Sequence, residues 1–135
     1  MWPRFIGFSI LNWITNIVVI MFLLQYVIPQ SWNPNLIALG PWFVSFVIAF
    51  IYAELAFRKK LPGMREAVTL AAIWLVIGYT LHIFYAEYLF GTARVVLLSP
   101  DIHITYVCEL AAIGLAATVT RRKRIEAALG EGLED

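Results

Sequence analysis

Four long apolar runs, separated by short polar segments, make up most of the chain. They cover residues 5–27, 36–57, 67–90 and 102–120. A bilayer core about 30 Å thick is crossed by a helix of roughly 20 mostly apolar residues, so each run is long enough to span it. The pattern therefore predicts an all-α fold, an integral membrane bundle of four antiparallel transmembrane helices that forms a single domain.

The segments between the runs carry turn and boundary signals. Prolines and asparagines crowd residues 29–35, and Pro41 predicts that the regular part of the second helix begins near Gly40. A short basic loop with a Pro-Gly pair joins runs two and three. The less hydrophilic segment 91–101 is expected to lie along the membrane interface. Residues 121–135 form the predicted cytoplasmic tail, whose acidic part is expected to be a helix that frays in water.

Composition and charge support the membrane assignment and give it a direction. Hydrophobic residues make up 61% of the chain and charged residues 14%, against roughly 45–50% and about 25% in soluble domains. With the N-terminus inside, nine of the ten basic residues fall on the inner side, and Arg94 alone falls outside. Basic residues favour the cytoplasmic side, so we expect a multi-pass protein of the cell (inner) membrane with both termini in the cytoplasm.

The first run contains a polar stripe. Ser9, Asn12 and Asn16 are spaced by three and four residues, which puts them on one face of a helix. Amide groups are costly in contact with lipid, so this face is expected to point toward protein or a water-filled gap. It either forms hydrogen bonds between helices or lines a polar path.

Two titratable groups lie at membrane depth in the later runs. Counted at about 1.5 Å per residue, His82 lies roughly 12 Å below the outer boundary and Glu109 roughly 10 Å. The similar depths would allow the two side chains to meet. Such a pair would form a proton or cation site, or else a polar contact that fixes helix packing. His82, Glu109, Asn12 and Asn16 are thus the candidate intramembrane polar site.

Other chemistries find little support in the pattern. Bis-histidine haem ligation by His82 and His103 is disfavoured because their depths differ by about 10 Å. The histidines and Glu87 and Glu109 match no zinc signature. No cofactor or metal is expected, and no motif of an enzyme or a nucleic-acid-binding protein occurs. Haem or ion binding remains a variant of the alternative in which the chain is an accessory subunit.

The inner end of the second run has charged residues at its boundary. Glu54 precedes Arg58 by four residues, the order that favours an ion pair on a helix. Lys59 and Lys60 follow directly. Glu54, Arg58, Lys59 and Lys60 are therefore candidate contacts for lipid headgroups at the cytoplasmic rim.

The beginning of the chain resembles the GtrA-like family of small membrane proteins. The likeness rests on Arg4-Phe5, Leu11-Asn12 and Asn16, and on a second run from Asn35 to Arg58, which together cover roughly the first 58 residues. The family's Asn-Arg element near the end of helix two is replaced by Ala53-Glu54. The resemblance implies four helices, cytoplasmic ends, and movement of polyprenyl-phosphate-linked sugars or support of a glycosyltransferase. It also implies that Asn12, Asn16 and the basic inner loop contact a lipid-linked sugar phosphate.

Two functions are therefore expected. The first is a carrier or flippase-type protein for a lipid-linked or polar substrate. The second is a non-catalytic accessory or assembly subunit of a larger membrane complex. A bundle of only four helices is thin, and its polar stripe must be kept away from lipid. The expected partners are therefore the lipid bilayer and either further copies of the chain or other membrane subunits.

Overall fold

The computed structural model describes residues 2–29, 31–59, 62–91 and 93–131. These residues form helices joined by turns, which confirms the predicted all-α class. In chain order the elements are α1 (Trp2–Phe22), the π-helical turn η1 (Leu23–Val27), α2 (Pro34–Phe57), α3 (Met64–Phe90), α4 (Ala93–Leu98) and α5 (Pro100–Glu131).

Four helices in the described part of the chain are long and apolar enough to cross a membrane. Their mean hydropathies lie between 1.6 and 2.1, and they cover Trp2–Val27, Pro34–Phe57, Met64–Leu89 and Pro100–Gly130. Each corresponds to one of the four predicted runs, and the third span ends one residue before its run does. The short helix α4 occupies the segment that was expected at the interface.

The helix boundaries depart from expectation in two places. α2 begins at Pro34, where the Asn33 side chain accepts a hydrogen bond of 2.9 Å from the backbone N–H of Asn35, and Pro41 lies inside the helix. The helix thus begins before Pro41 because Asn33 caps it and Pro34 suits the first turn. α5 continues through Glu131 into the predicted tail, where Arg122 and Glu126 pair at 2.7 Å one turn apart.

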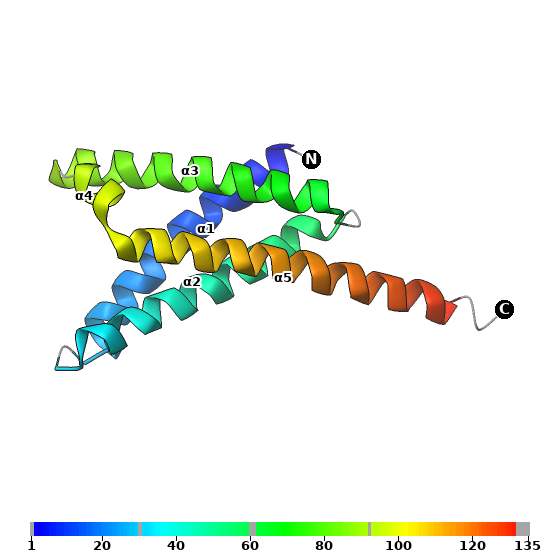
Figure 1. Cartoon of the computed structure of the whole chain (residues 1–135), viewed down its shortest axis with the longest axis horizontal. Helices are drawn as coiled ribbons and strands as arrows, with labels where there is room; N and C mark the ends of the chain where they lie inside the picture. Colours follow the sequence, from blue (N-terminus) through cyan, green and yellow to red (C-terminus); the bar gives the residue numbers. More distant parts are fainter. Residues whose placement is uncertain (1, 30, 60–61, 92, 132–135) are drawn as a thin grey trace.

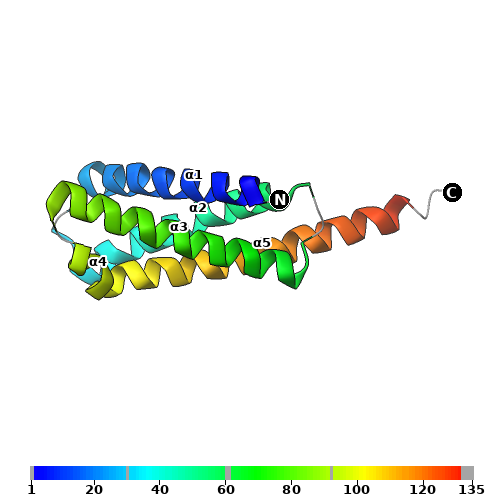
Figure 2. The same cartoon turned by 90° about the horizontal axis from the view of Figure 1, so that it is seen from above.

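The helices form a bundle in which each long helix packs against two others. α1 packs against α2 and α3, and α5 also packs against α2 and α3. α1 and α5 therefore lie on opposite sides of the bundle, as Figure 2 shows. Figure 1 shows the C-terminal part of α5 extending beyond the other helices. The turn between α1 and α2 lies at the same end of the bundle as α4, and the beginning of α1 lies toward the other end (Figure 2).

Small residues form the closest helix contact, between α2 and α5. Ala49 and Ala53 of α2 and Ala112 and Ala116 of α5 are completely buried. Small side chains let two helix backbones approach each other, so this interface gains dispersion energy without large side chains. Glu109 lies one turn before Ala112 on the same helix, so the packing of α2 against α5 holds its side chain inside the bundle.

Candidate functional site

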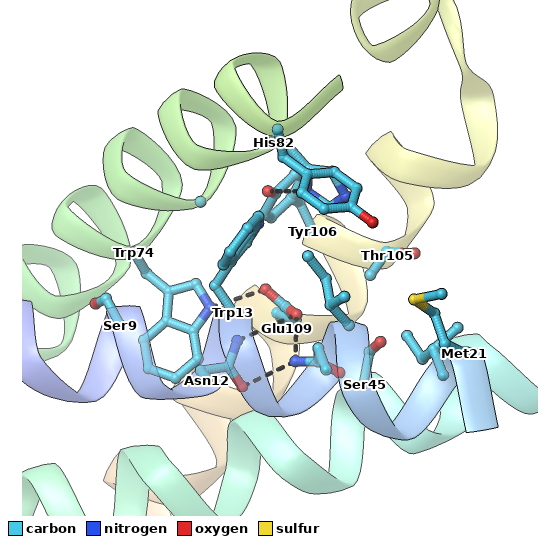
Figure 3. A pocket seen from close by; sticks show the side chains of 15 residues that line it. Ser9, Asn12, Trp13, Met21, Ser45, Trp74, His82, Thr105, Tyr106 and Glu109 are labelled. Carbon is cyan, nitrogen blue, oxygen red and sulfur yellow. Dashed lines mark hydrogen bonds between the residues drawn. The ribbon is translucent and has the colours of Figure 1, made fainter. Parts of the chain in front are cut away.

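A buried carboxylate lies at the centre of the bundle. Glu109 of α5 is only 3% exposed and accepts hydrogen bonds from three side chains. Its Oε1 accepts from Nδ2 of Asn12 at 3.3 Å and from Nδ2 of Asn16 at 3.1 Å. Its Oε2 accepts from Nε1 of Trp74 at 2.8 Å. Donors from α1 and α3 thus satisfy both oxygens of a side chain on α5 (Figure 3).

The polar stripe of α1 presents the two amides. Asn16 Nδ2 also donates to Oδ1 of Asn12 at 3.0 Å, because residues four apart face each other on a helix. The third residue of the stripe behaves differently. Ser9 donates to the backbone carbonyl of Phe5 at 2.8 Å, so its own helix satisfies it. Only the two asparagines of the stripe therefore contact Glu109.

A partly open cavity of about 190 Å³ lies beside Glu109, lined mainly by α1, α3 and α5 (Figure 3). Ser45 of α2 also lines it. Three of its lining residues carry a buried polar atom without a hydrogen-bond partner among the described residues, namely Asn16 Oδ1, Ser45 Oγ and Trp13 Nε1. Unpartnered buried polar atoms are rare in proteins because each loses its hydration. Two further unpartnered atoms, on Arg4 and Thr120, lie elsewhere in the described chain, so three of the five belong to residues that line this cavity.

Aromatic rings form much of the cavity wall. The ring of Trp13 meets the rings of His82 and Tyr85 edge to face, with centroids 6.0 and 5.8 Å apart. Tyr106 hydrogen-bonds to Nδ1 of His82 at 2.9 Å and stacks on Tyr79 at 4.2 Å. Much of the wall is therefore aromatic, and Glu109 forms part of it.

All four residues of the predicted intramembrane polar site line this cavity. His82 and Glu109 do not use each other as hydrogen-bond partners, since His82 binds Tyr106 and Glu109 binds Asn12, Asn16 and Trp74. His82 and Glu109 thus do not form the pair that their similar depths would allow. Each belongs to its own hydrogen-bonded group, and both groups line the same cavity.

Counted in the same way with the N-terminus inside, Asn12 and Asn16 are expected in the inner half of the first run and Glu109 in the outer half of the fourth, and this expectation needs a correction. Placing Asn12 and Asn16 in the inner half and Glu109 in the outer half separates groups that in the structure are hydrogen-bonded. Counting from the helix ends exaggerates the difference, because Asn16 is the midpoint of residues 5–27 and Glu109 lies two residues from the midpoint of 102–120. The polar groups form one layer near the middle of the helices.

The residues predicted as headgroup contacts lie away from the cavity, at and just after the C-terminal end of α2. Glu54 pairs with Lys123 of α5 at 2.7 Å, not with Arg58 as expected, because α5 continues as a helix alongside the end of α2. The carbonyl of Arg58 accepts a hydrogen bond from Arg124. Lys59 borders a separate hollow beside Arg4, and Lys60 lies outside the described residues.

The structure shows no arrangement of ligands for a metal in the part of the chain it describes. No group of three or more His, Cys, Asp or Glu side chains gathers among those residues. His103 is engaged through both ring nitrogens, with Tyr79 at 2.5 Å and the carbonyl of Leu97 at 2.8 Å. Its ring therefore holds α4 against α3 and α5.

Sequence reasoning missed the aromatic part of the site. Tryptophan collects at membrane interfaces, so Trp74 inside the third run was a signal that its N–H needs a buried partner. Trp74, Gly78 and His82 follow each other at intervals of four, which places them on one face of α3. Tyr106 lies three residues before Glu109 and shares its face. Comparison of the chain with family models, curated proteins and solved structures gives no match.

Proposed function

We propose that this chain is a small multi-pass carrier of the cell (inner) membrane, with four antiparallel spans, cytoplasmic termini and a polar substrate. One observation carries the proposal: the buried carboxylate of Glu109 lies beside a cavity that is lined by three residues with an unpartnered buried polar atom. Charged groups at membrane depth are costly and mark substrate or ion pathways in many membrane proteins. The nine-to-one distribution of basic residues supports the orientation.

The unpartnered atoms favour a carrier over a packing contact. A polar group that only fixes helices is best satisfied completely, because each unpaired buried atom costs about 1–3 kcal/mol. Glu109 itself is well satisfied by Asn12, Asn16 and Trp74. Asn16 Oδ1 and Ser45 Oγ remain free in the described part of the chain. A bound polar molecule would give these two atoms partners.

The cavity also bears on the kind of substrate. Pockets for drug-sized ligands have volumes of about 300–1,000 Å³, whereas this cavity measures about 190 Å³. A lipid-linked sugar phosphate would exceed this volume, and its phosphate would be repelled by the Glu109 carboxylate. Of the two substrate classes expected from the sequence, a small polar molecule is therefore preferred. The GtrA-like resemblance remains a prediction from the first 58 residues.

The second candidate function is a non-catalytic accessory or assembly subunit. It is favoured by the hydrogen bonds that join α1, α3 and α5 through Glu109, since such bonds fix helix packing in membranes. On this reading the lipid-facing surfaces would bind further copies of the chain or other membrane subunits, a glycosyltransferase among them.

Uptake into liposomes distinguishes the two functions. Purified protein is reconstituted and tested with a panel of small polar solutes, with Glu109→Gln as the variant and Glu126→Gln, at the exposed end of α5, as the matched control. A carrier gives saturable uptake of at least one solute, and Glu109→Gln abolishes it while the protein stays folded and assembled. Uptake of no solute by the wild type, together with loss of assembly in Glu109→Gln, would contradict the carrier and support the accessory subunit.

A further inference from the structure

We infer that the cavity beside Glu109 binds a small organic cation that also carries a hydroxyl group, an inference that rests on the proposed carrier function and specifies its substrate class. Four properties of the cavity lead to this ligand: its charge, its aromatic walls, its free hydrogen-bonding atoms and its volume. Each property excludes a different class of alternative.

The charge of the lining selects a cation. Among the described residues that line the cavity there is one carboxylate, Glu109, and neither lysine nor arginine. His82 is the one imidazole in the lining, and the phenols of Tyr85 and Tyr106 complete its titratable groups. An anion here would meet the Glu109 carboxylate at low dielectric without a lysine or arginine to offset the repulsion. A cation would instead supply the Glu109 carboxylate with the positive charge that no lysine or arginine among the described lining residues provides.

The aromatic walls select an organic cation over a metal ion. Trp13, Trp74, Tyr85 and Tyr106 all line the cavity, and Trp13 and Tyr85 meet at 78° to form a corner. Ring faces attract ammonium groups, and aromatic cages are a general means of binding quaternary ammonium ligands. Hard metal ions need six or more oxygen ligands, which a lining dominated by aromatic and aliphatic side chains does not offer.

The free polar atoms select a hydroxyl or another small donor on the ligand. Asn16 Oδ1, Ser45 Oγ and the N–H of Trp13 are buried without a partner in the described chain, and a small movement of these side chains would let the first two accept a hydrogen bond from the ligand and the third donate to its oxygen. These atoms come from α1 and α2, whereas Glu109 comes from α5. Because the Asn16 amide lies 3.1 Å from Glu109 Oε1, the hydroxyl and the ammonium group of the ligand would bind close to each other, with the ammonium group near the carboxylate and the rings.

The volume limits the size of the ligand. An engineered cavity of about 150 Å³ in another protein accommodates benzene, which has six non-hydrogen atoms. A cavity of about 190 Å³ thus suits a ligand slightly larger than benzene. Choline, a hydroxylated quaternary ammonium of about seven non-hydrogen atoms, has this size and both functional groups. It serves as the probe, without being assigned as the natural substrate.

The test compares choline with its neutral carbon isostere, 3,3-dimethylbutan-1-ol. The two have the same shape and hydroxyl group and differ only in the charge. Isothermal titration of the protein in maltoside detergent is expected to give at least about 30-fold tighter binding of choline, from the combined attraction of the carboxylate and the rings. Equal affinity for the two ligands, or binding of neither, would overturn the inference.

Variants identify where the choline binds. Glu109→Gln should weaken choline binding about 10-fold or more and leave the isostere unaffected, and Trp13→Leu should weaken choline more than Trp13→Phe does. The control Glu126→Gln should bind choline as the wild type does. Choline binding that is unchanged in both Glu109→Gln and Trp13→Leu would overturn the assignment to this cavity. The carrier function fails by a separate result, which is the absence of Glu109-dependent uptake of any solute.

Discussion

The side-chain amide of Asn16 on α1 lies 3.1 Å from Oε1 of Glu109 on α5, across the diagonal of the four-helix bundle. α2 and α3 lie between these two helices, and each packs against both of them. The amide and the carboxylate therefore connect the two helices that the backbone packing keeps apart. Trp74 on α3 completes the connection by donating to the other carboxylate oxygen at 2.8 Å.

The first prediction concerns the number of acceptors that Glu109 offers. Glu109→Gln replaces one carboxylate oxygen by an NH2 donor, which must face either the two asparagine amides or the N–H of Trp74. We expect a cost of about 1–3 kcal/mol in the free energy of unfolding. In a Trp74→Phe background the NH2 group can face the phenyl ring, so the same substitution should cost less. Unfolding in mixed micelles, followed by circular dichroism, measures both values.

Trp13 supplies the matched control for this cycle. Its N–H lines the same cavity but has no hydrogen bond to Glu109. The costs of Trp13→Phe and Glu109→Gln should therefore add within about 0.5 kcal/mol, whereas the Trp74 pair should deviate from additivity. Additive costs for both pairs would contradict the assigned role of Trp74.

The second prediction compares two glycines. A Cβ on Gly78 would lie 2.7 Å from Cε1 and 2.9 Å from the hydroxyl of Tyr106, a ring that is held by stacking on Tyr79. Gly78→Ala should therefore displace Tyr106 and cost about 1–3 kcal/mol. A Cβ on Gly114 meets nothing within 4 Å, so Gly114→Ala should be neutral or stabilise the helix by up to about 1 kcal/mol. Equal thermal stability of the two variants in detergent would contradict the prediction.

The third prediction separates the two histidines. Tyr106→Phe removes the hydroxyl that binds Nδ1 of His82 but keeps the ring that stacks on Tyr79. It should cost about 0.5–1.5 kcal/mol and shift the ring-nitrogen resonances of His82 alone. Tyr79→Phe should instead shift those of His103, its partner at 2.5 Å. Spectra of the protein with isotope-labelled histidine measure both shifts, and a shift of both residues in either variant would count against two independent pairs.

The four helices could be predicted because the apolar runs have the length that a bilayer requires. The end of α5 could not, since charged residues after Thr120 look like the end of a membrane span whether or not the helix continues. It continues because residues 121–131 are good helix formers, and Lys123 of this extension reaches Glu54 on α2. That contact depends on two elements far apart in the sequence, so local spacing pointed to Arg58 instead.

The polar half of the site was predictable and the aromatic half was not. Polar groups in an apolar run are conspicuous, so Asn12, Asn16, His82 and Glu109 could be named directly, and all four line one cavity. Their mutual contacts depend on helix tilt and rotation, which spacing along one helix does not determine. Aromatic residues are common in membrane helices. Only its position away from the interface therefore indicated that Trp74 is the third donor to Glu109.

The last prediction tests the proposed orientation in the membrane. In a Cys108→Ala background, single cysteines are placed at the exposed positions Ser31, in the turn between α1 and α2, and Ala128, in the final part of α5. In the proposed topology nine of the ten basic residues lie on the side of the termini, so Ser31→Cys should face outward and Ala128→Cys the cytoplasm. A membrane-impermeant maleimide should label Ser31→Cys in intact cells, and Ala128→Cys only after the cells are permeabilised. The opposite pattern would invert the orientation, and labelling of both positions in intact cells would contradict four spans, because three crossings, an odd number, separate the first turn from the end of α5 in that topology.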